Sequence, residues 1–75
     1  MNKQRRKALE RISDKLEEIK VELQYVLEEE QDAYDNTPES LQETDRYVES
    51  EDAISAMEDA DGAIQEAIDY LSDWL

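Results

Sequence analysis

The sequence predicts an all-α fold, an antiparallel hairpin of two helices that pack as in a coiled coil. Apolar residues near the start follow one another at alternating steps of three and four, which places them along one side of an α-helix. The same spacing returns about forty residues later, so this apolar stripe has a partner within the chain. No stretch alternates with a period of two for long, as a half-buried strand would. We therefore expect one helical-hairpin domain over residues 1–75, with helices at 3–33 and 51–74 and a link at 34–50.

The first helix is predicted from its apolar stripe and from its composition. Residues 3–33 contain neither Gly nor Pro and consist mostly of strong helix formers. We expect the helix to begin at about Asn2 or Lys3. The stripe expected to face the second helix consists of Leu9, Ile12, Leu16, Ile19, Leu23 and Val26.

The link is predicted from the single proline of the chain. Pro38 disfavours helical geometry at Thr37, while Thr37 is a suitable N-cap for a helix that has Pro38 at its first position. Two further pairs have the spacing of a capping box, Asn36 with Glu39 and Ser40 with Glu43. We expect a short helical turn or an irregular extension over residues 38–48.

The second helix is predicted from a stripe of the same spacing, which consists of Ile54, Met57, Asp61, Ile64, Ile68, Leu71 and Leu75. Residues that recur every seven positions beside it, three of them small enough to let two helices approach closely, are Ala53, Ala60, Ala67 and Trp74. Aligning the two stripes in opposite directions pairs Leu9 with Leu71, Ile12 with Ile68, Leu16 with Ile64, Leu23 with Met57 and Val26 with Ile54. The same alignment places Asp61 opposite Ile19, where its carboxylate either reaches the edge of the seam or meets a base such as Lys15 or Lys20.

The charge of the chain is strongly acidic and unevenly distributed. Eight Lys and Arg stand against 22 Asp and Glu, which gives a net charge of -14 and a pI near 4.1. Residues 1–20 hold seven bases and four acids, whereas residues 21–75 hold one base, Arg46, and 18 acids. Such a charge repels nucleic acid and anionic lipid and attracts basic surfaces. It argues against direct nucleic-acid or membrane binding.

Several classes of chemistry find no support in the residues. The chain has no cysteine and no histidine, so it lacks disulfides, thiolate zinc ligands and the usual neutral-pH base. Residues 59–64 resemble part of an EF-hand loop, but Gly62 at the sixth position puts Met57 first and Ile68 twelfth, where oxygen ligands are required. No apolar run approaches the roughly 20 residues of a membrane helix. We expect no metal, no cofactor and no enzymatic activity.

The remaining signal is a cluster of acids around the predicted link, for which solubility of the helix surface is the simplest explanation. Their crowding favours a second explanation, because carboxylates held on rigid helices can imitate the phosphates of a duplex. Such a surface would occupy the Lys/Arg site of a nucleic-acid enzyme, where Arg can hold carboxylates bidentately. The residues expected to bind this partner, hereafter the acidic cluster, are Glu28, Glu29, Glu30, Asp32, Asp35, Glu39, Glu43, Asp45, Glu49, Glu51 and Asp52.

The link also carries a family resemblance. The segment Tyr34-Asp35-Asn36-Thr37-Pro38-Glu39-Ser40-Leu41-Gln42, followed by Arg46, resembles the link of small acidic helical-hairpin proteins encoded by bacteriophages and mobile elements. The likeness extends loosely over the whole length, but Tyr47 and Val48 depart from the smaller, more polar residues of those relatives. The resemblance implies a phage accessory protein, and small acidic phage proteins often inhibit host defences such as CRISPR nucleases and restriction enzymes.

Two main hypotheses follow for the function, beside a third possibility, a small phage regulator that binds a protein through Tyr25, Leu27 and Trp74. In the first, the chain is an anti-CRISPR or anti-restriction inhibitor in the cytoplasm of a host bacterium, and its partner is a basic nucleic-acid-binding nuclease. In the second, it is a structural or adaptor coiled coil that dimerises or binds a partner protein through its apolar seam, with the acids serving solubility. A homodimer that forms a four-helix bundle is compatible with both.

Overall fold

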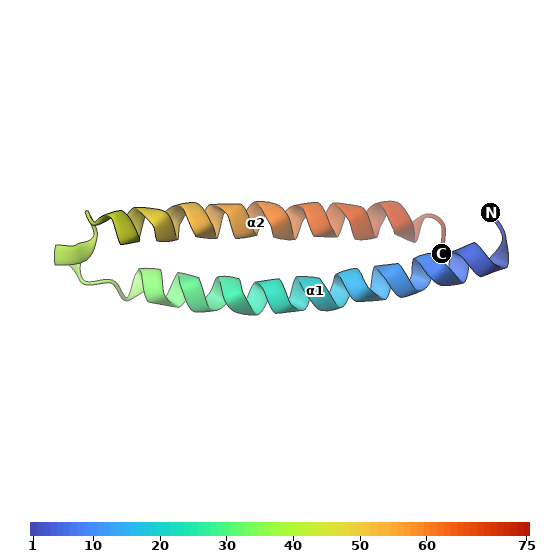
Figure 1. Ribbon diagram of the computed structural model, residues 1–75, viewed down its shortest axis with the longest axis horizontal. Coiled ribbons are helices and arrows are strands. Elements are labelled where there is room, and N and C mark those ends of the chain that lie inside the picture. Colours follow the sequence, from blue (N-terminus) through green and yellow to red (C-terminus); the bar gives the residue numbers. More distant parts are fainter.

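The structure is a computed structural model that describes all 75 residues. Two long helices, α1 (Lys3–Asp35) and α2 (Asp45–Ser72), are joined by a link that contains one short 3₁₀ helix, η1 (Glu39–Leu41). The helices lie side by side in opposite directions and form a rod of 59 × 15 × 13 Å (Figure 1). The predicted all-α two-helix hairpin is therefore confirmed. We call the end of the rod at the link the closed end and the end with both termini the open end.

The first helix begins as expected and ends two residues later than expected. The Asn2 side chain accepts a hydrogen bond of 2.8 Å from the Arg5 backbone N–H and so caps the helix start. At the other end the Thr37 hydroxyl donates to the Ala33 carbonyl at 2.9 Å, and the Asn36 amide donates to the Asp32 carbonyl at 2.8 Å. Thr37 thus helps to satisfy the last carbonyls of α1. The prediction that Thr37 caps a new helix is wrong, because η1 has no side-chain cap.

The second helix begins at Asp45, six residues before the predicted position 51. Its N-cap is Thr44, whose hydroxyl accepts a hydrogen bond from the Tyr47 backbone N–H at 3.4 Å. The apolar stripe predicts a later start for this helix, because the first two turns of α2 carry mostly polar residues and so lie outside the stripe. Neither predicted capping box forms, since η1 has no side-chain cap, and only the expected short helical turn is present in the link.

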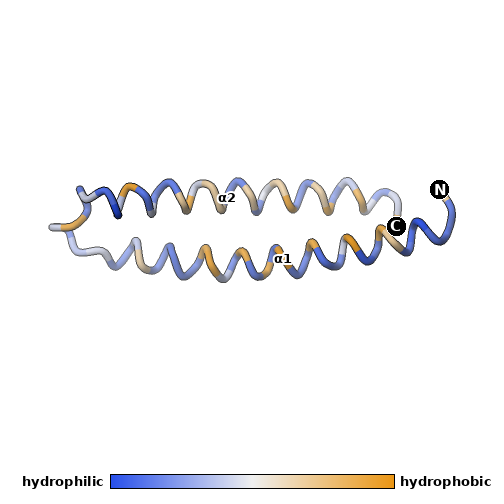
Figure 2. The backbone as a smooth tube through the Cα atoms, viewed as in Figure 1, coloured by the Kyte–Doolittle hydropathy of each residue, from blue (hydrophilic) through white to orange (hydrophobic).

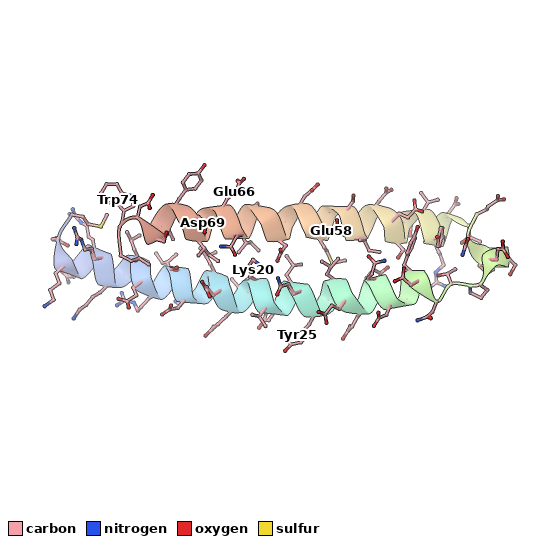
Figure 3. All side chains as sticks on the ribbon, turned by 180° about the vertical axis from the view of Figure 1, so that it is seen from behind. Lys20, Tyr25, Glu58, Glu66, Asp69 and Trp74 are labelled. Atoms are coloured by element: carbon pink, nitrogen blue, oxygen red, sulfur yellow. The ribbon has the colours of Figure 1, made fainter.

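Three contacts fix the register of the two helices. The Lys20 ammonium lies 3.5 Å from an oxygen of Asp61, the Ser50 hydroxyl donates to Glu30 at 2.6 Å, and the Tyr34 and Tyr47 rings stack with centroids 4.3 Å apart. In this antiparallel register Leu9 lies opposite Leu71, Leu16 opposite Ile64, and Leu23 opposite Met57, as the aligned stripes predicted. Lys20 is also one of the two bases expected near Asp61, and it lies between the helices in Figure 3.

The side of α1 that faces α2 differs from the prediction. Ile12, Ile19 and Val26, expected in the contact, are 47%, 50% and 53% exposed. The next residue along in each case, Ser13, Lys20 and Leu27, is buried or half-buried instead. The seam between the helices therefore consists of Leu9, Ser13, Leu16, Lys20, Leu23, Leu27, Glu30 and Tyr34 of α1, and of Tyr47, Ser50, Ile54, Met57, Asp61, Ile64, Ile68 and Leu71 of α2.

The physical reason for this rotation of α1 is the polar groups in the seam. The predicted packing would have set the Asp61 carboxylate against Ile19, and an unpaired charge in an apolar contact is costly. Turning α1 by one residue brings Lys20 to Asp61 and Glu30 to Ser50. The leucines remain in the seam in either arrangement.

The core of the hairpin is thin. Only Ser13, Ile54 and Ile68 are buried, and no side chain is completely enclosed. Figure 2 shows the reason, since hydrophobic residues recur along both helices but alternate with hydrophilic ones on every turn. Neither helix combines the length and the apolar character that crossing a membrane requires.

Candidate functional site

The structure brings all eleven residues of the acidic cluster to the closed end. Five lie in the last two turns of α1, two in the link and four in the first two turns of α2. Ten of the eleven are exposed, and Glu30 is half-buried in the seam. Arg46 is the one base in residues 28–52, and it forms no ion pair, since the single ion pair of the molecule joins Lys20 to Asp61.

The density of charge at the closed end is close to that of a duplex. Residues 28–35 of α1 and residues 45–52 of α2 lie at the same level of the rod, and together they carry eight exposed carboxylates. Eight helical residues span about 12 Å, and when the half-buried Glu30 and Arg46 are also counted the net charge of -8 gives about one negative charge per 1.5 Å. Double-stranded DNA carries one negative charge per about 1.7 Å of axis. The closed end thus matches nucleic acid in linear charge density.

Two acids of the cluster are held by hydrogen bonds that close the hairpin. Tyr34 donates its hydroxyl to Glu51 at 2.5 Å, and Ser50 donates to Glu30 at 2.6 Å. The hydrogen bond to Glu51 requires the Tyr34 proton and raises the pKa of Tyr34 well above its ordinary value, and the neighbouring Tyr47 adds to the shift. The stacked rings of Tyr34 and Tyr47, 12° from parallel, complete the network. Glu30 and Glu51 therefore have a structural role in addition to any binding role.

Sequence reasoning did not find this tyrosine network, although a signal for it is present. Tyr34 follows Leu27 by seven residues, and Tyr47 precedes Ile54 by seven, so both tyrosines continue the seam that the structure contains. The prediction ended both stripes earlier because the residues between are polar. Tyr34 was expected within the link, but it lies in the last turn of α1.

An open recess of about 760 Å³ lies at the closed end beside the tyrosine pair. Its lining includes the apolar residues Ala33, Leu41 and Ala53 together with Arg46. The recess contains no histidine or cysteine, because the chain has none. No three or more Asp or Glu side chains in the molecule are arranged to hold a metal ion. Because polar and charged side chains such as Arg46 and Glu49 lie among these apolar residues, the recess is suited to an apolar or aromatic group that also carries a polar atom.

A second surface is formed by the residues that directly precede one seam residue of each seven-residue repeat. These seam residues are Ser13, Lys20, Leu27 and Tyr34 of α1 and Tyr47, Ile54, Asp61 and Ile68 of α2. In an antiparallel pair, equivalent positions of the two helices lie on the same side of the seam. The recess confirms this geometry, since Ala33 of α1 and Ala53 of α2 both line it. We call this surface the apolar flank, and it consists of Ile12, Ile19, Val26, Ala33, Ala53, Ala60 and Ala67, with Arg46 at its closed end and Trp74, two residues past the last residue of α2, at its open end.

The opposite side of the seam is polar. The residues that directly follow Leu9, Leu16, Leu23, Glu30, Ser50, Met57, Ile64 and Leu71 of the seam carry no apolar side chain, and we call them the polar flank: Glu10, Glu17, Gln24, Gln31, Glu51, Glu58, Gln65 and Ser72. Other exposed apolar residues lie elsewhere on the two helices and the link. Tyr25, for example, points away from α2 on the outer side of α1 (Figure 3). The hairpin therefore has apolar residues along one side of its seam and none along the other.

Comparison of the chain with protein-family models, with curated proteins and with solved structures found no match.

Proposed function

We propose that the protein is a non-enzymatic mimic of nucleic acid that occupies the basic nucleic-acid-binding site of another protein. The class of partner proposed is a host defence nuclease, such as a CRISPR effector or a restriction enzyme, and the proposed setting is a phage-infected bacterial cell. The observation that supports this function is the array of eight exposed carboxylates along about 12 Å of rigid helix, at the charge density of a duplex.

The rigidity of the two helices is what makes this array suitable. Both segments belong to regular helices whose ends are capped by Thr37 and Thr44, and the tyrosine network fixes one helix to the other. Carboxylates on a flexible chain would have to be ordered on binding, at an entropic cost that a preformed surface avoids. A groove lined by Lys and Arg gains charge-assisted hydrogen bonds from such a surface.

The experiment is retention of proteins from a host lysate on the immobilised chain, with recovered nucleases then tested for inhibition. The test variant carries Glu28→Lys, Asp32→Lys and Asp52→Lys, three exposed cluster acids whose side chains make no hydrogen bond or ion pair. The matched control carries Asp59→Lys, Glu66→Lys and Asp73→Lys, two exposed acids of α2 and its exposed C-cap residue, all outside the cluster. Both variants change the net charge by the same amount.

We expect the cluster variant to lose inhibition and the control variant to retain most of it. The affinity of the unmodified chain for the partner should fall at least about tenfold between 50 and 200 mM salt, because the contact is between exposed charges. Equal losses in the two variants would show that net charge, and not the arrangement of the cluster, is responsible. Inhibition that is independent of salt would contradict the mimic.

The alternative function, a structural or adaptor coiled coil, changes in one respect. Its partner was expected to bind the apolar seam, but the chain's own second helix occupies that seam. The exposed Ile12, Ile19 and Val26 favour the apolar flank as the surface for this function instead.

A further inference from the structure

The apolar flank is the largest unpartnered feature of the molecule. We propose that a second copy of this chain covers it, packed face to face with the ends reversed, so that Trp74 of each copy occupies the closed-end recess of the other. The product is an antiparallel four-helix bundle. This inference is independent of the proposed function, because the acidic cluster lies mainly on the outer sides of the helices.

The thin core calls for a second copy. Chains of fewer than about 70–80 residues rarely hold a fold with one small core and are usually helped by disulfides, a metal or oligomerisation. This chain has no cysteine and buries only two apolar side chains, Ile54 and Ile68. A second copy would remove Ile12, Ile19 and Val26 from water, and these side chains are now about half exposed.

The area available matches what a stable dimer needs. The broad face of the rod measures 59 × 15 Å between Cα atoms, so each copy offers an area on the order of 900 Å². A standard protein interface buries about 800 Å² on each partner. Full overlap of two such faces is possible only if the helices run parallel or antiparallel to each other along their whole length.

The distribution of charge selects the reversed orientation. Residues 1–20 have a net charge of +3, residues 21–57 of -11, and residues 58–75 of -6. Reversed ends place the basic start of α1 beside the acidic half of α1 in the other copy. Ends in the same direction would place the two halves of charge -11 together. Reversal also brings Lys15 of each copy near Glu22 of the other, since these residues lie one turn before and one turn after Ile19.

The ends of the flank are complementary in shape. Ile19 and Ala60 lie at the centre of the flank, so reversal about this centre brings Trp74 of one copy level with Ala33 and Arg46 of the other. These two residues line the recess of about 760 Å³, which falls in the range of pockets that enclose drug-sized groups, about 300–1,000 Å³. Trp74 is 55% exposed, and Arg46 offers its indole a cation–π contact.

The first test compares Ile19→Glu with Val21→Glu. The two residues lie on α1 and are 50% and 49% exposed, but only Ile19 belongs to the apolar flank. We expect a dimer by light scattering for the unmodified chain and for Val21→Glu, and at least a tenfold weaker dimer for Ile19→Glu. The emission of Trp74, the only tryptophan, should shift to longer wavelength on dissociation. A monomer at all concentrations in the unmodified chain, or equal behaviour of the two variants, would overturn the proposal.

The second test uses cysteines, which the natural chain lacks, and does not depend on whether Ile19→Glu folds. In the reversed dimer Ile19→Cys faces its own copy, so mild oxidation should cross-link it at least tenfold faster than Val21→Cys. Ile12→Cys should cross-link only after mixing with Val26→Cys. Cross-linking of Ile12→Cys with Ala67→Cys instead would show that the ends point in the same direction and refute the proposed orientation.

Discussion

Lys20 and Asp61 form the one ion pair of the molecule, in the middle of the seam, and its replacement tests how the hairpin tolerates a charge there. The side chains are 20% and 24% exposed, and their charged atoms are 3.5 Å apart. The enclosed Asp61 oxygen accepts no hydrogen bond, so the ammonium is its only compensation. At 3.5 Å the attraction is about 1 kcal/mol in water and roughly 5 kcal/mol in a partly buried site.

The single and the double replacement should differ in sign. Removing one partner of a fully buried pair costs about 3–5 kcal/mol, and partial exposure here reduces the expected loss for Lys20→Met to about 2–3 kcal/mol. Asp61→Leu should be close to neutral, because the Lys20 side chain can extend to water. The double variant should equal the unmodified chain or exceed it by up to about 2 kcal/mol, since apolar residues often replace such pairs at no loss.

The assay is urea and thermal unfolding followed by circular dichroism, with the four proteins at one fixed concentration because oligomers gain stability with concentration. A loss of 1 kcal/mol lowers the midpoint temperature of a chain this short by about 4–8 °C, so the expected differences are measurable. The cycle should give a coupling of about 2–5 kcal/mol between the two positions. A neutral Lys20→Met, or a double variant as unstable as Lys20→Met, would refute the view that Asp61 depends on Lys20.

Three further outcomes are expected. Gly62→Ala should stabilise the chain by about 0.5–1 kcal/mol in urea unfolding, because a Cβ at this helical position meets no atom within 4 Å; a loss would mean that the position is in close contact in solution. Thr44→Ala should cost about 1 kcal/mol through the lost N-cap of α2, whereas an unchanged midpoint would place the start of α2 elsewhere. In an alkaline titration followed by phenolate absorbance, a step well above the ordinary pKa of tyrosine should appear, and Tyr34→Phe should remove it. Because the pKa of Tyr34 is raised in the fold, its contribution to stability is complete below about pH 10 and is lost as the pH rises above that value.

The sequence was sufficient for the helices and the register but not for the rotation of α1. The leucines at 9, 16 and 23 repeat every seven residues and lie in the seam whichever side of them α2 packs against. On one side of them stand isoleucine and valine, and on the other stand Ser13, Lys20 and Leu27. Hydrophobicity alone favours the first side, and the structure uses the second. Only the pairing of Asp61 with Lys20 decides between the sides, and that pairing is a long-range contact that periodicity does not report.

The site was predictable in place but not in its internal division of roles. Charge counting located the acidic cluster at the closed end, and the structure brings its members together there. It did not distinguish Glu51 and Glu30, which accept hydrogen bonds from Tyr34 and Ser50, from freely exposed acids such as Glu28. That distinction depends on which residues lie opposite one another across the seam. It follows from the rotation of α1 and could not be made before it.

The seam and the apolar flank together suggest what the polar residues accomplish. Five of the sixteen seam residues are polar, namely Ser13, Lys20, Glu30, Ser50 and Asp61. Polar residues at such positions fix register at a cost in stability. Apart from Arg46 the flank contains no polar residue, and its apolar side chains lie where the two helices of one chain do not pack on them. A hairpin built in this way has its register set within the chain, while Ile12, Ile19 and Val26 of the flank stay about half exposed and would contribute hydrophobic free energy only if another surface covered them.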